Sequence, residues 1–111
     1  MNQDVERALA RVTGFKWDEG NTPKVLGRHG VEPGECEQAF FGFPFIVSFD
    51  AKHLGHEQRW HALGKTGPGR HLFVVFTLRG SSIRVLAARD MNRKERSVYA
   101  TSAQAIADSD L

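Results

Sequence analysis

A glycine turn between two strongly apolar segments constrains the fold of this chain more than any other feature of its sequence. Residues 71–78 are almost wholly apolar and rich in Val and Phe, a composition typical of a central strand covered on both faces. Gly80-Ser81 fits a two-residue type II′ turn, because glycine stands at its first central position. Residues 83–88 then supply the second strand of an antiparallel hairpin.

This turn also determines which side chains of the hairpin share a face. With a two-residue loop, Arg79 lies opposite Ser82 and Thr77 lies opposite Arg84. Side chains alternate between the two faces of a sheet, so Arg79, Thr77 and Arg84 lie together, away from apolar residues such as Phe76. The two arginines form a predicted phosphate-binding pair. The alternative is an exposed sheet face with ordinary solubilising arginines.

The remaining patterns predict helices around this hairpin. In chain order, the expected elements are a helix over 4–12, an edge strand over 15–17, helices over 24–29 and 33–42, strands over 43–49, 57–65, 71–78 and 83–88, and a helix beginning at Asn92. Residues 100–111 are small, polar and weakly patterned, so we expect a flexible tail. The predicted fold class is α+β, an antiparallel sheet of about four strands with helices packed on one face.

Length, composition and cysteine content exclude several classes of protein. The 111 residues suffice for one domain, and the 41% of hydrophobic residues suits a globular core. No apolar run approaches the roughly 18 residues that span a bilayer, so we expect no membrane partner. A single cysteine, Cys36, forms no internal disulfide, which fits a reducing cytoplasm.

Charge is concentrated in one part of the chain. Residues 52–96 contain ten Lys/Arg against three Asp/Glu, a balance of +7, whereas the whole chain carries only +2. Such a concentration is typical of a surface that binds a polyanion such as RNA. A solvated basic face without a partner is the alternative reading.

The predicted strand over 57–65 carries a second group of candidate residues. Glu57, Arg59, His61 and Lys65 alternate onto one face of it. Whether they join the arginines of the hairpin depends on the loop around Gly67. A four-residue loop would put the two groups on opposite faces, whereas three or five residues, or a bulge, would put them together.

Two other clusters of residues indicate a functional site less strongly. Lys24, Arg28 and His29 lie on one short predicted helix, where they suit phosphate binding or merely stabilise the helix C-terminus. His53 and His56 are spaced like metal ligands, but a third and fourth ligand are missing. We therefore expect no metal and no other cofactor.

Taken in order, the motifs of the chain resemble a known family. The amino half carries Phe15-Lys16-Trp17-Asp18-Glu19-Gly20-Asn21, Lys24, Arg28-His29-Gly30-Val31 and Glu35-Cys36-Glu37-Gln38-Ala39-Phe40-Phe41. The carboxyl half carries His53, Glu57-x-Arg59, Ala62-Leu63-Gly64-Lys65-Thr66, Phe73-Val74-Val75-Phe76-Thr77-x-Arg79-Gly80, Ile83-Arg84-Val85-x-Ala87-Ala88-Arg89-Asp90-Met91, Asn92-Arg93-Lys94-Glu95-Arg96 and Tyr99. Over about residues 15–99 this order and spacing resemble the BrnT toxins. Asn21, Val25 and Ala87 depart from the residues usual in that family.

The resemblance implies a fold, an activity and a partner. It implies a RelE-like fold and a metal-free ribonuclease toxin of a type II toxin–antitoxin pair, which inhibits translation in the cytoplasm. The implied partner is a BrnA-like antitoxin with a ribbon-helix-helix region, whose dimer holds the toxin inactive in a hetero-oligomeric complex. Residues 1–14 would be an amino-terminal helical extension, 15–99 the toxin domain and 100–111 the flexible tail.

RNA cleavage without a metal needs a base, an acid and cations that stabilise the phosphorane. The candidates for charge stabilisation are Arg59, Arg79 and Arg84, those for acid and base are His29 and His61, with Glu57 as an alternative base, and those for binding flanking RNA are Lys24, Arg28, Lys65, Arg89, Arg93 and Lys94. The second hypothesis is a toxin-like module that binds RNA or an antitoxin without catalysis.

Overall fold

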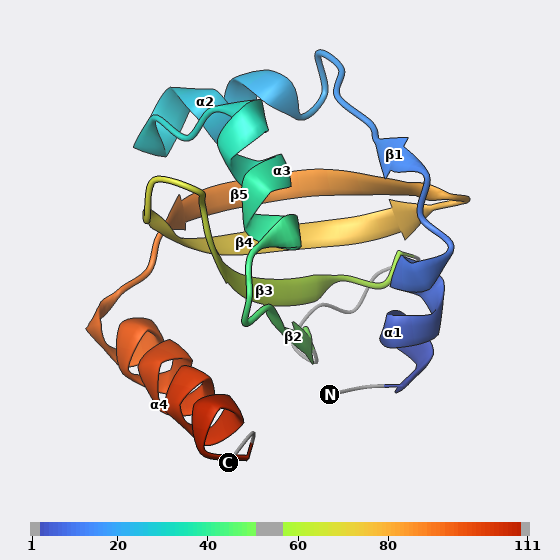
Figure 1. Cartoon of the computed structure of the whole chain (residues 1–111). Helices are drawn as coiled ribbons and strands as arrows, with labels where there is room; N and C mark the ends of the chain where they lie inside the picture. Colours follow the sequence, from blue (N-terminus) through green and yellow to red (C-terminus); the bar gives the residue numbers. More distant parts are fainter. Residues whose placement is uncertain (1–2, 51–56, 110–111) are drawn as a thin grey trace.

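The computed structural model describes residues 3–50 and 57–109, which form a five-stranded sheet with helices on both sides (Figure 1). In chain order the elements are α1 (Gln3–Ala10), β1 (Gly14–Phe15), α2 (Thr22–His29), α3 (Pro33–Phe41), β2 (Ile46–Phe49), β3 (Trp60–Lys65), β4 (His71–Arg79), β5 (Ser82–Asp90) and α4 (Arg93–Ser109). The strand order across the sheet is β1-β5-β4-β3-β2. The α+β class predicted from the sequence is confirmed.

The sheet differs from the predicted one in strand number and direction. We expected about four antiparallel strands, but β1 adds a fifth and runs parallel to β5. The backbone amide of Lys16 extends this pairing by donating to the Ile83 carbonyl (2.8 Å). Local patterning predicts that residues near Phe15 are extended, but it carries no information on which distant strand they join.

The β4–β5 hairpin has the predicted register. Arg79 pairs with Ser82 and Thr77 with Arg84, across a turn in which Gly80 has a φ of +60°. That angle lies in the left-handed region that glycine adopts without strain. Further along, the register shifts at Val75/Phe76, so that Leu86 is an extra residue in β5, a β-bulge.

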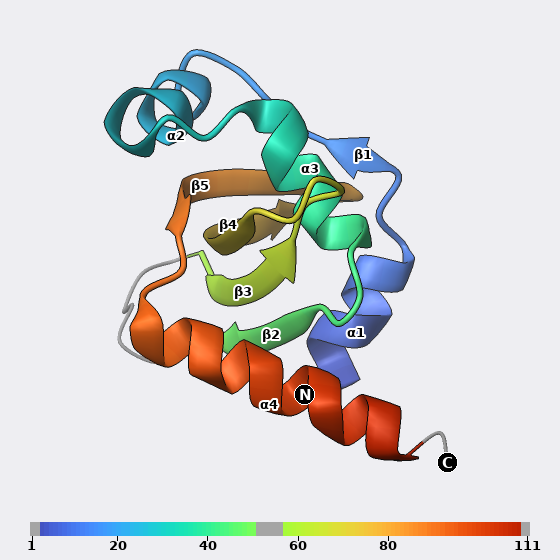
Figure 2. The ribbon, with the colours of Figure 1, turned by 60° about the vertical axis from the view of Figure 1, so that its left-hand side comes forward.

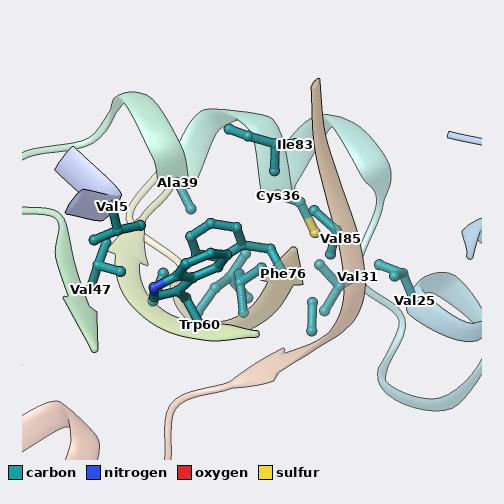
Figure 3. Close-up of a cluster of buried hydrophobic side chains, with 14 residues drawn as sticks. Val5, Val25, Val31, Cys36, Ala39, Val47, Trp60, Phe76, Ile83 and Val85 are labelled. Atoms are coloured by element: carbon teal, nitrogen blue, oxygen red, sulfur yellow. The ribbon is translucent and has the colours of Figure 1, made fainter. Parts of the chain in front are cut away.

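One face of the sheet, here called the covered face, is packed by α1, α2 and α3. Phe76 is fully buried at its centre, with Trp60 stacked beside it at 5.9 Å between ring centroids (Figure 3). The helices contribute Val5, Val25 and Ala39 to the same cluster. Burying a side chain such as that of Phe76 contributes about 1.5–3 kcal/mol, so this layer is the main source of stability.

The opposite face, here called the open face, is partly covered by α4 (Figure 2). Tyr99 packs there with Met91 and Leu63, and its hydroxyl donates to the Pro44 carbonyl at 2.7 Å. The prediction of helices on one face only is therefore wrong. Tyr99 gives α4 its apolar contact with this second face.

The last helix is longer than the sequence indicates. An Asn92/Glu95 capping box starts it as predicted, with reciprocal bonds of 2.8 and 2.9 Å, but it continues through Ser109 rather than ending in a flexible segment near Ala100. Alanine-rich sequence sustains a helix by intrinsic propensity even where no apolar stripe is present. Within the described part of the chain, no helix combines the length and apolar character needed to cross a membrane.

Candidate functional site

The open face carries the candidate residues in successive cross-strand rows. Lys65 pairs with His71, so the intervening loop, Thr66–Arg70, has five residues. This length puts the β3 candidates on the same face as Arg79 and Arg84, an arrangement that the sequence left undecided. From the α4 end to the turn, the rows are Ile46–Leu63–Phe73–Arg89, Ser48–His61–Val75–Ala87, Thr77–Arg84 and Arg79–Ser82. The segment just before β3 extends the last two rows with Arg59 and Glu57, because Thr77 bonds to the Gln58 carbonyl and Arg79 pairs with Glu57.

His61 lies in the second row against a carboxylate. Its Nε2 is 3.2 Å from Oδ2 of Asp50, and the side chains are 34% and 16% exposed. A carboxylate at Nε2 favours the tautomer with its proton on that nitrogen, which leaves Nδ1 as a proton acceptor. An oriented imidazole of this kind is suited to general base catalysis.

Arg59 precedes His61 by two residues and lies on the same face. No ion pair joins it to a carboxylate within residues 3–50 and 57–109, and its Nε is buried without a hydrogen-bond partner there. Thr77, in the same row, donates its hydroxyl to the Gln58 carbonyl at 2.6 Å and so fixes the backbone beside Arg59. A buried donor without a partner is unusual in proteins. Arg59 is therefore available to an anion.

Arg79 and Arg84 share the open face as predicted, but each is already paired with a carboxylate. Arg79 Nε is 2.8 Å from Glu57 Oε2, and this contact lowers the pKa of Glu57 and raises that of Arg79. Arg84 is mostly buried and grips Asp18 with two bonds of 2.7 and 2.9 Å. The hydrogen bonds from Arg84, together with one from the Gly20 amide, lower the pKa of Asp18 to about 2.

Arg84 and Asp18 hold the loop before α2 against β5. Gly20 packs so close to this pair that a Cβ on it would stand 2.7 Å from Arg84 Nη2. Asn21 adds a buried bond from its Nδ2 to the Val85 carbonyl at 3.0 Å. Arg84 therefore has a structural contact that the sequence did not reveal, because its partner lies 66 residues away.

Arg89 occupies the α4 end of the open face. Its guanidinium lies 4.1 Å from the ring centroid of Phe73 and makes two bonds of 2.7 and 2.9 Å to Glu95. The Arg89 hydrogen bond lowers the pKa of Glu95, so the carboxylate stays ionised. Beside this pair, Lys94 lines a cleft that also contains His61.

Other predicted residues lie away from these rows. His29 and Lys24 line a separate cleft where α2 meets β5, which separates His29 from His61. Lys65 lines a third cleft with Phe41 and Phe43, and Arg93 is exposed at the start of α4. His53 and His56, and the side chain of Arg28, lie outside the described residues.

Sequence reasoning missed Arg70, which joins three segments of the chain. Its guanidinium bonds to Asp90 at 2.7 Å, to Glu35 at 3.1 Å and to the carbonyls of His29 and Gly30 at 3.2 Å. These bonds connect the junction of α2 and α3 to the strand ends. Asp50 and Asp18 were also missed as partners, although Asp18 belongs to the Trp17-Asp18 motif that carried the family resemblance.

The described part of the chain offers no group of three or more His, Cys, Asp or Glu side chains arranged to hold a metal ion. The buried Cys36 thiol has a pKa raised to about 12, mainly by desolvation, so it stays protonated and unreactive at neutral pH. The chemistry available on the open face is thus that of histidine, carboxylates and arginines.

Comparison with known proteins identifies one family. A model described as "Ribonuclease toxin, BrnT, of type II toxin-antitoxin system" matches residues 17–95, which is more than half of the chain and includes all four rows of the open face. Among curated proteins, the chain has no match.

Proposed function

The chain belongs to the BrnT family of ribonuclease toxins of type II toxin–antitoxin systems, and on that premise we propose that it is a cytoplasmic endoribonuclease that cleaves RNA without a metal ion and so inhibits translation. The observation that carries the proposal is the His61–Asp50 contact beside Arg59 on the open face. The proposal includes a RelE-like arrangement, which follows from the family resemblance.

His61 is the proposed general base. Its Nδ1 accepts the proton of a ribose 2′-hydroxyl, the 2′-oxygen bonds to phosphorus, and the bond from phosphorus to the 5′-oxygen breaks. Asp50 acts as a positioning residue that keeps the His61 imidazole in the tautomer with its proton on Nε2. Glu57 is held ionised by Arg79 and His29 opens onto another cleft, so we propose that the leaving 5′-oxygen takes its proton from water.

Arg59 is the proposed main stabiliser of the phosphorane charge. Charged donors aimed at developing charge supply a large share of enzymatic rate enhancement. Arg79 contributes less, because Glu57 already neutralises it, and Arg84 acts through the position of the loop that it holds. Lys94 and Arg89 are placed to bind flanking RNA.

The test is cleavage of RNA by the purified protein in excess chelator. We expect cleavage to proceed, and to be lost in His61→Gln while the fold is retained. Activity that chelator abolishes and magnesium or zinc restores would contradict the metal-free mechanism. An intact protein that binds RNA but does not cleave it under either condition would instead favour the non-catalytic module.

Family membership implies an antitoxin partner, and we propose that it covers the open face. A ribbon-helix-helix antitoxin with acidic or apolar residues in its toxin-binding segment would block phosphate entry and neutralise charge. We expect the double variant Arg79→Ala/Arg84→Ala to cleave poorly and to bind the antitoxin more weakly, above all at low salt. Affinity that is unchanged at two salt concentrations, with cleavage lost, would place the antitoxin elsewhere.

A further inference from the structure

A cleft of ≈ 640 Å³ lies between the open face and α4. Its floor is the apolar part of the first row, Ile46, Leu63 and Phe73, and His61 borders it. The N-terminal part of α4 forms the wall and places Asn92 and Lys94 at the rim. Figure 2 shows α4 running beside β3 and β2, which is the orientation that creates this wall.

The cleft combines an apolar floor with a polar rim, on which Lys94 is a cation and the Glu95 carboxylate is paired with Arg89. Phe73 contributes an aromatic ring, with the Arg89 guanidinium lying over it. The Lys94 ammonium makes no ion pair within the described residues, and the Asn92 side chain uses its oxygen to cap α4, leaving its amide donors for a ligand. A flat π-system with hydrogen-bonding edges and an attached phosphate matches these groups.

We propose that this cleft binds one unpaired nucleobase of the RNA, next to the phosphate on which His61 acts. The inference rests on the proposed function, because His61 and Arg59 define where the reacting phosphate lies. The His61 row and the apolar row are neighbours, two residues or about 7 Å apart along the strands. A base in the cleft thus lies within one nucleotide of the reaction.

The wall formed by α4 makes the cleft selective for single strands. A base inside a duplex is stacked above and below and presents only its edge, so it cannot enter a slot between a helix and a sheet. The proposed ligand is therefore a nucleotide in a single-stranded or looped segment. Double-stranded RNA of the same sequence should be a poor substrate.

A second cleft provides a matched control. The space of ≈ 580 Å³ between α2 and β5 is of similar size and also carries a lysine, Lys24. Its lining includes Leu86 and Ala88 but no Phe, Tyr or Trp, and its one aromatic ring is the His29 imidazole. Comparing the two clefts separates nucleobase recognition from simple attraction of a phosphate to a lysine.

The first experiment measures binding of the four nucleoside 3′-monophosphates by calorimetry and by amide chemical shifts. We expect binding that perturbs residues of β3 and the start of α4, and that weakens roughly tenfold or more in Phe73→Leu. Val98 is 46% exposed on α4 and lines the cleft, so Val98→Trp should fill it and abolish binding, whereas Val98→Ala should not. Lys24→Ala should leave binding unchanged.

The outcomes distinguish failure of this inference from failure of the proposed function. Absence of nucleotide binding, unchanged affinity in Val98→Trp, or shifts that map to the α2–β5 cleft would each overturn the base site, whether or not RNA is cleaved. Nucleotide binding at the cleft by a protein that does not cleave RNA would overturn the ribonuclease instead. If both hold, Val98→Trp should raise KM more than it lowers kcat and should change the preferred cleavage sites.

Discussion

The covered and open faces of the sheet are held by different physical interactions. On the covered face, Phe76, Leu72 and Val85 are fully buried and contribute through apolar contact with three helices. On the open face, Arg79 and Arg84 are held by directional ion pairs with carboxylates from other segments. The stabilisation from apolar burial depends on the apolar surface that is removed from water and does not change with pH. The stabilisation from an ion pair depends on its geometry and on the ionisation of both groups. We therefore expect stability and activity to respond to substitutions on different faces.

The largest expected effect that distinguishes the two faces is a loss of cleavage rate caused by a substitution on the open face. His61→Gln removes the proposed base, so cleavage of RNA should fall by about 10²–10⁴-fold, while the unfolding free energy changes by about 0.5 kcal/mol or less. The measurement is the initial rate of cleavage beside a denaturant titration. His29→Gln is the matched control. A larger loss of cleavage rate in that variant would assign the acid–base role to His29, in the cleft beside α2.

A comparable free-energy change is expected on the covered face, in stability alone. Phe76→Ala leaves a cavity at the centre of the core and should lower the unfolding free energy by about 3–5 kcal/mol. Val75→Ala, one residue earlier but on the open face, should cost about 1 kcal/mol or less. Equal losses of stability in the two variants would show that the open face is packed as tightly as the covered one.

Within the open face, replacement of Arg59 and replacement of Arg79 should differ in their effect on the cleavage rate. Arg59→Ala removes a cation that has no ion pair among the described residues and should slow cleavage by about 10²–10³-fold. Arg79→Ala removes a cation that Glu57 already neutralises, so its effect should be smaller. Single-turnover rates at saturating enzyme test this order. The reverse order would mean that the Arg79–Glu57 pair opens when RNA binds.

A smaller effect is expected where α4 meets the open face. Tyr99→Phe removes the buried bond to the Pro44 carbonyl and should lower the unfolding free energy by about 1 kcal/mol. Because α4 forms the wall of the cleft beside His61, KM for RNA should rise as well. Thermal unfolding combined with steady-state kinetics separates the two results, and an unchanged KM would mean that the helix holds its position without this bond.

The smallest effect concerns acid stability. The pKa of Asp18 is lowered from 3.8 to about 2, so its pair with Arg84 stabilises the fold fully above pH 4 and loses that contribution as the pH falls towards 2. Asp18→Asn should flatten this part of the curve of unfolding free energy against pH. The contribution is modest, because the Asp18 side chain is 42% exposed. A curve of unchanged slope would show that other carboxylates dominate acid unfolding.

The parts of the fold set by local chemistry were predictable. The glycine turn predicted the pairing of Arg79 with Ser82, and the Asn92/Glu95 spacing predicted the start of α4. Contacts between distant segments were not predictable, because nothing near Arg84 in the sequence indicates Asp18 as its partner. The roles assigned to His61, Arg59 and the other site residues remain predictions that the proposed experiments test.

The extra residue at Leu86 interrupts the alternation of side chains halfway along β5, so the residues after it point to the opposite faces from those expected of a regular strand. Arg89 lies five positions after Arg84, an odd offset, and an uninterrupted strand would point the two side chains to opposite sides of the sheet. The insertion reverses the alternation, so both arginines face the same way while Val85 and Ala88 both enter the core. Deleting Leu86 would therefore invert everything that follows it in the strand, taking Arg89 away from Phe73 and Glu95. A relative that lacks this one residue would therefore present a different set of arginines on the open face.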